Sequence, residues 1–215
     1  MIKILIIGKK SFIGSHLKKY LSKYFVVNNY SFEQIMEKKQ SLLQTYSHVI
    51  NTCIHKNYIN HKYNQRFDLD IIFINKFKNC NFKYLFLNTR KVYLQKENIS
   101  ERSKISPVDM YGHNKYLTET LLKKKLAKNL ISLRISNIIG KKKFKNKRNN
   151  HKLFFDNFLE YKKKNKKIII NDNFKDFITI VQFSNVIKKI INSKIYGTYN
   201  ISLSKKVYIS EIVSW

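Results

Sequence analysis

The sequence contains few of the residues that cross-link or interrupt a small protein. Among 215 residues there are two cysteines, one proline and five glycines. Cys53 and Cys80 have neither the spacing of a metal site nor that of a redox motif, so we expect reduced thiols in a cytoplasmic protein. Because no run of about 18 apolar residues occurs, the sequence predicts no membrane-spanning helix.

Acidic residues are also scarce. The 13 Asp and Glu residues are outnumbered by 43 Lys and Arg residues, which gives a formal net charge of +30. Such a charge indicates either a polyanionic partner or a drift in composition. The lysines are scattered, and Lys, Asn, Ile, Tyr and Phe are abundant in every segment, so we favour drift and expect no specific nucleic-acid partner. A positively charged cleft would still concentrate anionic nucleotides.

The histidines do not suggest a metal site. No two of the five that lie outside predicted strands have the spacing of metal ligands. These histidines are His16, His55, His61, His113 and His151. We therefore predict no bound metal.

Apolar runs that end in polar residues or glycine alternate with segments of helical periodicity. The runs typical of strands lie at residues 2–7, 25–29, 48–52, 84–87, 130–135 and 197–201. The segments typical of helices lie at residues 12–24, 32–44, 63–77, 111–126 and 183–191. This alternation predicts an α/β fold with a doubly wound parallel sheet that helices cover on both faces. Only one helix lies between the second and third strands, so we expect the sheet to lack one edge strand.

The pattern weakens after Gly140. Residues 141–148 form a basic run typical of a loop, residues 153–161 favour a helix, and residues 166–171 favour a strand. A last helix is predicted over residues 207–215.

A loop with two glycines joins the first predicted strand to the first predicted helix, and it reads Gly8-Lys9-Lys10-Ser11-Phe12-Ile13-Gly14. The spacing of its glycines is typical of loops that let a pyrophosphate approach the backbone at a helix N-terminus. Ser11 stands where such loops usually have a middle glycine, but it is small and can donate a hydrogen bond. An ordinary strand-to-helix turn is the alternative. The position in an N-terminal βαβ unit favours phosphate binding.

Three further residues suggest chemistry. Tyr111 and Lys115 lie four residues apart and share one face of a predicted helix. An ammonium beside a phenol stabilises the phenolate, which helps the phenol to exchange a proton near neutral pH. Thr89 follows a predicted strand at the edge where open α/β sheets bind ligands, and its hydroxyl can hydrogen-bond a substrate oxygen. Each feature is common alone, but together with the glycine loop they favour a catalytic site.

The chain resembles an extended short-chain dehydrogenase/reductase of the NAD-dependent epimerase/dehydratase family, whose members act on nucleotide sugars. The resemblance covers nearly the whole chain, and the matching segments occur in the family's order. They are residues 8–17 (family pattern GxxGFIGSHL), 48–53 (DVVIHLAA), Asn75, 88–93 (SSxxVYG), 106–115 (P-x-s-x-YGxSK), 133–137 (LRxxN), 175–178 (RDFIHV) and 197–200 (GxYN).

The resemblance implies a role for each candidate residue. Tyr111 is the acid or base, Lys115 binds the nicotinamide ribose and tunes Tyr111, and Thr89 binds the reacting oxygen. Asn137 is expected to contact the sugar or its phosphate. The implied site for NAD or NADP comprises Gly8, Ser11, Phe12, Ile13, Gly14, Asn51, Thr52, Tyr111 and Lys115.

Arg90 and Lys91 narrow the implied reaction. In the family's 4,6-dehydratases an acid closely follows the threonine, whereas these two cations follow Thr89 here. A 4-keto reductase or a 4-epimerase of nucleotide sugars, serving surface polysaccharide synthesis, is therefore expected, with a slight preference for a reductase. Residues 28–31 contain neither a carboxylate that would select NAD nor an arginine that would select NADP, so both cofactors stay open.

The resemblance also implies how the chain is divided. Residues 1–140 would form a Rossmann-like dinucleotide-binding domain, and residues 141–215 a small, incomplete substrate-binding region partly interleaved with it. Family members extend beyond the length of this chain, so the alternative is a non-catalytic dinucleotide-binding protein that is a truncated or degenerate member. Members often dimerise through two helices of each subunit, which here would include residues 111–126, so a homodimer is a further expectation.

Overall fold

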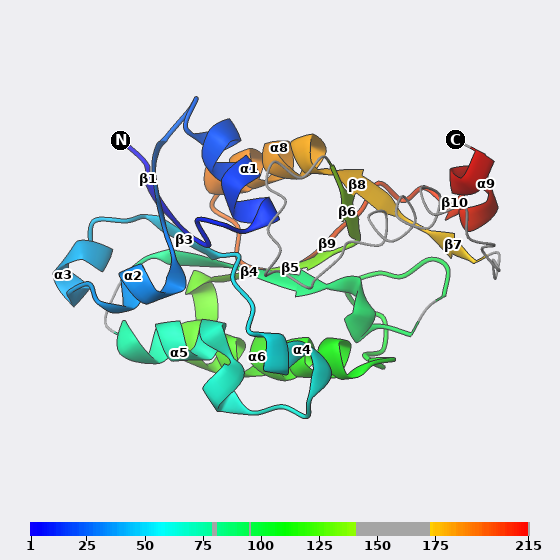
Figure 1. Ribbon diagram of the computed structural model, residues 1–215, viewed down its shortest axis with the longest axis horizontal. Coiled ribbons are helices and arrows are strands. Elements are labelled where there is room, and N and C mark those ends of the chain that lie inside the picture. Colours follow the sequence, from blue (N-terminus) through cyan, green and yellow to red (C-terminus); the bar gives the residue numbers. More distant parts are fainter. Residues whose placement is uncertain (79–80, 95, 141–172, 215) are drawn as a thin grey trace.

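The centre of the molecule is a parallel β-sheet. We describe the computed structural model over residues 1–78, 81–94, 96–140 and 173–214. The sheet has six strands in the order β2-β1-β3-β4-β5-β9, and every neighbouring pair is parallel (Figure 1). The strands are β1 (Lys3–Ile7), β2 (Val26–Tyr30), β3 (His48–Asn51), β4 (Lys83–Thr89), β5 (Leu130–Ile135) and β9 (Gly197–Ile201).

Helices cover both faces of the sheet. One face carries α1 (Phe12–Leu21) and α8 (Ile180–Ile191), which pack against each other. The other face carries α5 (Leu69–Lys76) and α6 (Met110–Leu126), with α4 (Lys56–Asn60) beside α6 (Figure 1). The shorter elements are α2 (Phe32–Met36), α3 (Gln40–Leu43) and the 3-10 turns η1 (Gln65–Phe67), η2 (Arg90–Val92) and η3 (Ala127–Asn129). The doubly wound Rossmann-like fold expected from the sequence is therefore confirmed.

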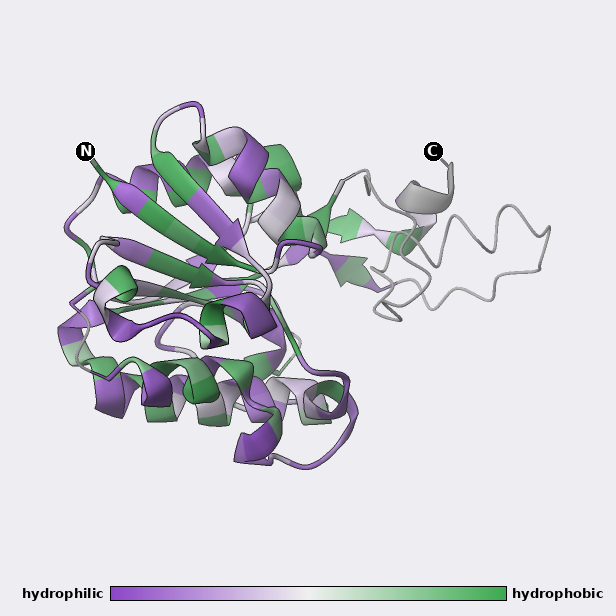
Figure 2. Cartoon of the chain, turned by 60° about the vertical axis from the view of Figure 1, so that its left-hand side comes forward, coloured by the Kyte–Doolittle hydropathy of each residue, from purple (hydrophilic) through white to green (hydrophobic). Residues whose placement is uncertain are grey.

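The core consists of one apolar layer on each side of the sheet. Successive side chains of a strand point to opposite faces. In β1, Ile4 and Ile6 join the layer under α1 and α8, while Leu5 and Ile7 join the layer under α5 and α6. A strand buried on both faces needs a continuous apolar run, which β1 has. Figure 2 shows the same arrangement, with hydrophobic strands between helices whose hydrophobic sides face the sheet.

A smaller group of strands lies beyond the carboxyl end of β5. There β6 (Asn137–Ile139) pairs in parallel with β8 (Phe177–Thr179), and β7 (Phe174–Lys175) pairs antiparallel with β10 (Val207–Tyr208). The last helix, α9 (Ile209–Ser214), follows β10 directly. The helix predicted over residues 207–215 was therefore placed too early, because its first two residues pair with β7.

Two predicted helices differ in extent from the structure. The helix expected over residues 32–44 is divided into α2 and α3. The helix expected over residues 63–77 begins only at Leu69, because the Asp68 carboxylate accepts hydrogen bonds from the N–H groups of Asp70 and Ile71 and caps the helix there. The structure also contains α4, which the sequence did not predict. The missing edge strand is confirmed, because the described sheet ends at β2.

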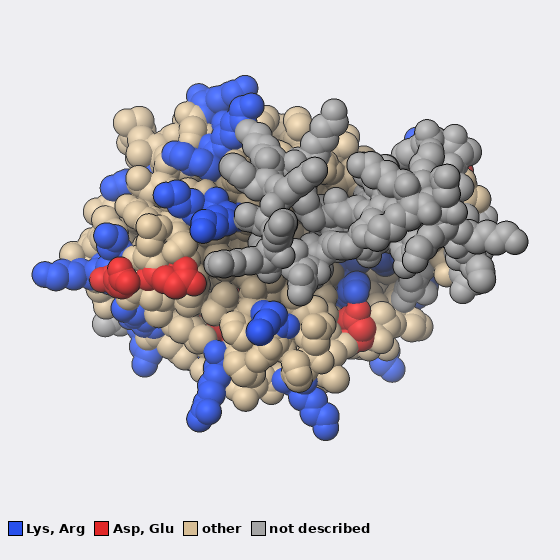
Figure 3. Space-filling view, viewed as in Figure 1, with Lys and Arg blue, Asp and Glu red and all other residues tan. Residues whose placement is uncertain are grey.

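Some predictions fall on residues that the structure does not describe. They are the loop at 141–148, the helix at 153–161 and the strand at 166–171, together with the predictions for Cys80 and His151. Within the described ranges, no helix has the length and apolar character needed to cross a membrane. Lys and Arg side chains project from many parts of the face drawn in Figure 3, in agreement with a charge that is scattered rather than gathered.

His48 is a buried histidine at the start of β3, and only 8% of its surface is exposed. Its Nδ1 lies 3.0 Å from the hydroxyl oxygen of Ser47. Burial, assisted by the nearby charge of Lys83, lowers the pKa of His48 from 6.5 to about 4. The imidazole is therefore neutral in the folded protein at pH values where it is charged in the unfolded chain.

We expect this difference to make stability depend on pH. Between pH 6.5 and about 4 only the unfolded state gains the proton, so the free energy of unfolding should fall by roughly 3 kcal/mol as the pH decreases. Urea unfolding at several pH values should show a smaller loss in His48→Asn than in the wild type. His113→Gln, which changes an exposed histidine, serves as control and should follow the wild type. Identical pH profiles for His48→Asn and the wild type would contradict this account.

Candidate active site

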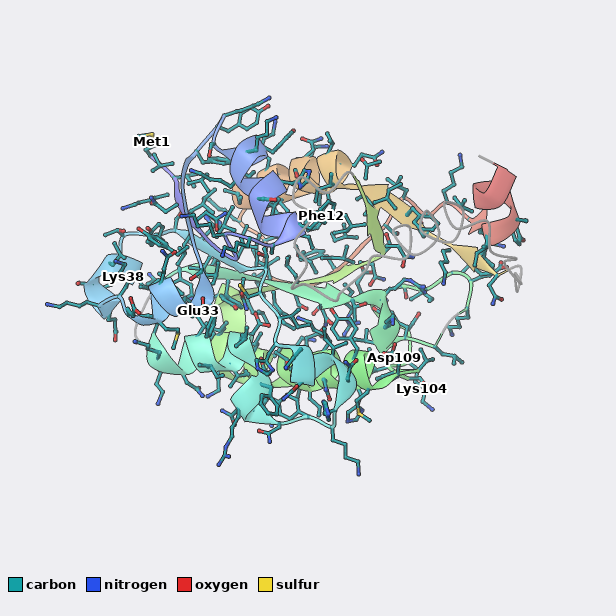
Figure 4. The ribbon with its side chains drawn as sticks, viewed as in Figure 1. Met1, Phe12, Glu33, Lys38, Lys104 and Asp109 are labelled. Atoms are coloured by element: carbon teal, nitrogen blue, oxygen red, sulfur yellow. The ribbon has the colours of Figure 1, made fainter. Side chains whose placement is uncertain are left out.

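The candidate residues gather at the carboxyl edge of the sheet. The glycine loop follows β1, and Thr89 ends β4. Open parallel sheets bind ligands at this edge. In Figure 4, Phe12 at the start of α1 and Asp109 at the start of α6 lie on opposite sides of the sheet. The first turns of both helices therefore flank the edge.

The glycine loop is folded so tightly that its two glycines are required. Gly8 has a φ of +125°, and a Cβ there would lie 2.1 Å from Thr52 Oγ1. A Cβ on Gly14 would lie 2.5 Å from the carbonyl oxygen of Gly8. Any larger residue would open the loop and move the N-terminus of α1 away from the sheet.

Ser11 takes the place of the expected middle glycine and closes a chain of hydrogen bonds. Gly14 N–H donates to Ser11 Oγ at 2.8 Å, and Ser11 Oγ lies 2.7 Å from Thr52 Oγ1. Thr52 donates its own hydrogen to the carbonyl oxygen of Ile7 at 2.8 Å. Ser11 is therefore the donor to Thr52. Both hydroxyls are engaged within the protein, where Ser11 is the N-cap of α1.

The first turn of α1 still offers groups for an anion. The first N–H groups of a helix have no acceptor within the helix, and Ser11 satisfies only that of Gly14. The amides of Phe12 and Ile13 stand in the same turn. Together with the positive end of the helix dipole they could hold a phosphate.

The end of β2 carries two asparagines, Asn28 and Asn29, whose side chains have different neighbours. Asn28 Oδ1 accepts a hydrogen bond from the Tyr46 hydroxyl at 3.0 Å. Asn29 Nδ2 lies 3.5 Å from the carbonyl oxygen of Gly14, which places this side chain against the glycine loop. Among the described residues, Asn29 Oδ1 is buried without a hydrogen-bond partner.

The end of β4 is fixed by a buried carboxylate. Asn88 accepts a hydrogen bond from Thr89 N–H at 2.8 Å and donates from its own amide to Glu119 Oε2. Glu119 is fully buried and also accepts from Arg134, at 3.0 Å from Nε and 2.7 Å from Nη2. Thr89 Oγ1 in turn accepts from Lys91 N–H at 3.3 Å and caps η2. These contacts set the position of the threonine hydroxyl.

Glu119 keeps its charge although it is buried. Burial by itself would raise the pKa of its carboxyl group, but hydrogen bonds from Arg134 and Lys123 outweigh burial and lower the pKa below its usual value. The two-pronged contact with Arg134 is the geometry that a guanidinium and a carboxylate favour.

The first turn of α6 packs directly against the turn that follows Thr89. A Cβ on Gly112 would lie 2.3 Å from the carbonyl oxygen of Lys91, so only glycine allows this approach. Asp109 caps α6 by accepting from Gly112 N–H at 2.8 Å, and it pairs with Lys91 at 2.5 Å. Lys91 Nζ lies 5.9 Å from the centre of the Tyr111 ring. The structure thus brings Tyr111 to the turn that begins at Thr89.

Lys115 lies one turn further along α6 and is buried. Its ammonium is 3.6 Å from Asp70 Oδ2 and 4.5 Å from the centre of the Phe86 ring. Asp70 Oδ1 also accepts from Asn51 Nδ2 at 3.0 Å and from the Tyr84 hydroxyl at 2.6 Å. Lys115 therefore compensates a buried carboxylate beneath the edge of the sheet.

Of the remaining predicted residues, Asn51 shares Asp70 with Lys115, whereas Asn137 lies apart from this centre. Both ends of the Asn51 amide are engaged, because Oδ1 accepts from Cys53 N–H at 2.9 Å while Nδ2 faces Asp70. Asn137 begins β6 in the smaller group of strands, and its Nδ2 donates to the carbonyl oxygen of Asp176 at 2.8 Å. Its proposed contact with substrate would have to be made from there.

Three residues that matter for the geometry were missed from the sequence. They are Asp70, Glu119 and Arg134. The sequence did contain a signal for the Glu119–Arg134 pair. Arg134 interrupts an apolar strand, and a buried arginine needs a carboxylate. Glu119 lies four residues after Lys115 on the same face of α6. Asp70 had no comparable signal, because the sequence placed it in the middle of the helix predicted over residues 63–77.

These features define a Rossmann-like α/β protein with a tyrosine–lysine pair at the carboxyl edge of its sheet. A protein-family model described as the NAD dependent epimerase/dehydratase family matches residues 4–202. The chain belongs to this family. No curated protein matches the sequence.

Solved structures with the same fold span this family's reactions. A UDP-N-acetylglucosamine 4-epimerase from Methanobrevibacter ruminantium has a TM-score of 0.80 at 17% identity, over 99% of this chain and 80% of that chain. A UDP-glucuronic acid 4-epimerase from Bacillus cereus, in complex with NAD, has a TM-score of 0.79 at 20% identity, over 99% and 82%. A dTDP-4-dehydrorhamnose reductase from Bacillus anthracis, in complex with NADP, has a TM-score of 0.74 at 17% identity, over 100% and 79%.

We expect the Glu119–Arg134 pair to be a principal determinant of stability. Glu119→Ala should lower the free energy of unfolding by about 3–5 kcal/mol, because it leaves Arg134 buried without a counter-charge. Glu119→Leu combined with Arg134→Met should cost less than either single change, since no charge is left unpaired. Urea unfolding measures the free energy of unfolding of the single and double variants.

The exposed Glu37 provides the matched control. Glu37→Ala should stay within about 0.5 kcal/mol of the wild type. A loss of less than about 1 kcal/mol for Glu119→Ala would show that the pair does not fix the end of β4.

Proposed function

We propose that the protein is an NAD(P)-dependent enzyme that acts at C4 of a nucleotide sugar, as a 4-keto reductase or a 4-epimerase. The observation that carries this proposal is the packing of the first turn of α6 on η2. It brings Tyr111 to the turn that begins at Thr89, at the same edge of the sheet as the glycine loop. Membership of the family and the reactions named for the structural relatives support the choice of substrate class.

Each residue has a chemical task in this proposal. Thr89 hydrogen-bonds the sugar oxygen at the reacting carbon, and Tyr111 gives that oxygen a proton or takes one from it. Lys115 stabilises the phenolate of Tyr111 and donates to the nicotinamide ribose. The contact of Lys115 with Asp70 is long at 3.6 Å, and an ammonium has three N–H donors. Lys115 can therefore keep this contact and still donate to the nicotinamide ribose. When bound, the nicotinamide supplies or accepts the hydride.

The glycine loop would hold the cofactor through the amides of Phe12 and Ile13, with Gly8 and Gly14 allowing the close approach. Ser11 and Thr52 would line this site while remaining hydrogen-bonded to each other. Asn29 stands where its amide could face the adenosine ribose. Residues 28–31 provide neither a carboxylate against a 2′-phosphate nor an arginine for it, so either NAD or NADP fits. The structural relatives include complexes with each of them.

The residues after Thr89 disfavour a dehydratase. Water elimination needs an acid beside the threonine, whereas Arg90 and Lys91 stand there, and the neighbouring Asp109 is paired with Lys91. The turnover assays described below distinguish reduction from epimerisation. A homodimer that includes α6 and a role in polysaccharide synthesis stay predictions from the family resemblance.

A non-catalytic dinucleotide-binding protein is the second candidate. The observation that favours it is the engagement of predicted site residues within the protein: Lys115 faces Asp70, and Asn51 is held at both ends. Such a protein would bind the dinucleotide through the glycine loop without turnover.

Tyr111→Phe tests the proposed chemistry. Removal of the hydroxyl should lower kcat by about 10²–10⁴, the usual contribution of an acid–base group, while NADH or NADPH still binds. Cofactor binding is followed by fluorescence. Turnover is followed as oxidation of NAD(P)H by a 4-keto nucleotide sugar and, by NMR, as interconversion of UDP-glucose with UDP-galactose and of UDP-glucuronic acid with UDP-galacturonic acid.

Tyr116→Phe on the same helix is the control, and it should retain wild-type turnover. Equal turnover by Tyr111→Phe and the wild type would remove Tyr111 from the mechanism. Cofactor binding without turnover of any of these sugars would favour the non-catalytic candidate.

A further inference from the structure

Arg90 is a half-buried arginine beside Thr89, at the edge of the candidate site. It follows Thr89 directly and begins η2. Among the described residues, no oxygen accepts a hydrogen bond from its guanidinium. A partly buried guanidinium has five donors to satisfy, and leaving them unpaired away from water is costly.

Other cations surround Arg90. Lys91 follows it in η2, and Lys175 lies nearby in β7 of the smaller group of strands. Burial, and then the charges of Arg90 and Lys91, lower the pKa of Lys175. Burial likewise lowers the pKa of Arg90, against the opposing effect of Asp176 and Asp109. Arg90 is therefore near Lys91 and Lys175, and near the carboxylates of Asp109 and Asp176.

The two acids near Arg90 are engaged elsewhere. Asp109 pairs with Lys91 and caps α6. Asp176 accepts from the N–H groups of Leu203 at 3.1 Å and Lys205 at 2.9 Å. Neither carboxylate accepts a hydrogen bond from Arg90, so among the described residues no oxygen takes up the donors of this half-buried guanidinium beside Thr89.

We propose that Arg90 binds a carboxylate carried by the sugar ring of the substrate, so that the protein prefers a nucleotide uronic acid to a nucleotide of a neutral hexose. This inference rests on the proposed function and names the class of sugar. A guanidinium presents paired N–H groups that match the two oxygens of a carboxylate.

The sugar ring is favoured over the nucleotide diphosphate as the source of this anion. Arg90 is the neighbour of Thr89, whose hydroxyl is assigned to the reacting carbon of the sugar. A group bonded to the next ring carbon would lie within reach of an adjacent side chain. Lys91 is paired with Asp109 and near the Tyr111 ring, which leaves Arg90 as the specific donor.

The test compares the binding of UDP-glucuronic acid, UDP-glucose and UDP to the full chain by isothermal titration. The buffer contains about 0.15 M salt, which screens the long-range attraction of a chain with a net charge of +30. The wild type should bind UDP-glucuronic acid about ten- to a hundredfold more tightly than UDP-glucose, as expected for a charge-assisted hydrogen bond. Arg90→Gln should lose this preference and bind UDP-glucose and UDP as the wild type does.

Two further variants control for charge and folding. Arg90→Lys keeps the charge and should keep part of the preference. Lys19→Gln removes one positive charge from an exposed position on α1 and should keep all of it. Circular dichroism confirms that each variant is folded, and Arg90→Lys provides the comparison if Arg90→Gln does not fold.

Three results would overturn the assignment. Equal binding of the two UDP sugars by the wild type, with Tyr111-dependent turnover intact, would refute the subsite and leave the proposed function standing. Weaker binding of UDP alone by Arg90→Gln would assign the guanidinium to the diphosphate. Binding of neither UDP sugar, together with no turnover, would refute the function and the subsite together.

Discussion

A buried carboxylate fixes helix α6 against the end of β4. Glu119 on α6 accepts from Arg134 on β5 and from Asn88 on β4, so one side chain joins the helix to two strands. Asn88 in turn holds Thr89, the last residue of β4. One turn before Lys115, Gly112 lets the helix touch the backbone of η2. The relative position of the Thr89 and Tyr111 hydroxyls depends on this contact between α6 and the end of β4, because neither the helix nor the strand alone would bring them together.

The scarce acidic residues have structural tasks in this region of the molecule. Asp68 caps α5, Asp70 faces Lys115, Asp109 caps α6, and Glu119 anchors the helix. Each carboxylate is held by N–H groups or by a cation, as a buried or capping charge must be. The large positive charge is spread over many parts of the face drawn in Figure 3. Arg90 differs from that background because it is half-buried beside Thr89, and no oxygen in the described part of the chain accepts a hydrogen bond from it.

The sequence predicted the sheet and its missing edge strand because strands buried on both faces read as continuous apolar runs, as in β1. It predicted that the glycine loop follows a strand, that Thr89 ends one and that Tyr111 lies on a helix, because local spacing carries that information. It could not predict that Asn51 faces Asp70 or that Ser11 holds Thr52, since these contacts join residues distant in the chain. The shift of the α5 start to Leu69 depended on the cap at Asp68, and the strand at Val207 depended on pairing with β7. The strand is a tertiary choice that propensity does not contain, whereas the cap is a local contact that an aspartate before a helix can indicate.

A crystal structure with NAD⁺ or NADP⁺ bound tests the central claim most directly, namely that the join of α6 to β4 forms one wall of a dinucleotide site. The account predicts a pyrophosphate on the amides of Phe12 and Ile13, and a nicotinamide ring flanked by the Thr89 and Tyr111 hydroxyls. It also predicts that the Lys115 ammonium reaches the nicotinamide ribose. A dinucleotide bound at another surface, or a nicotinamide remote from both hydroxyls, would contradict it.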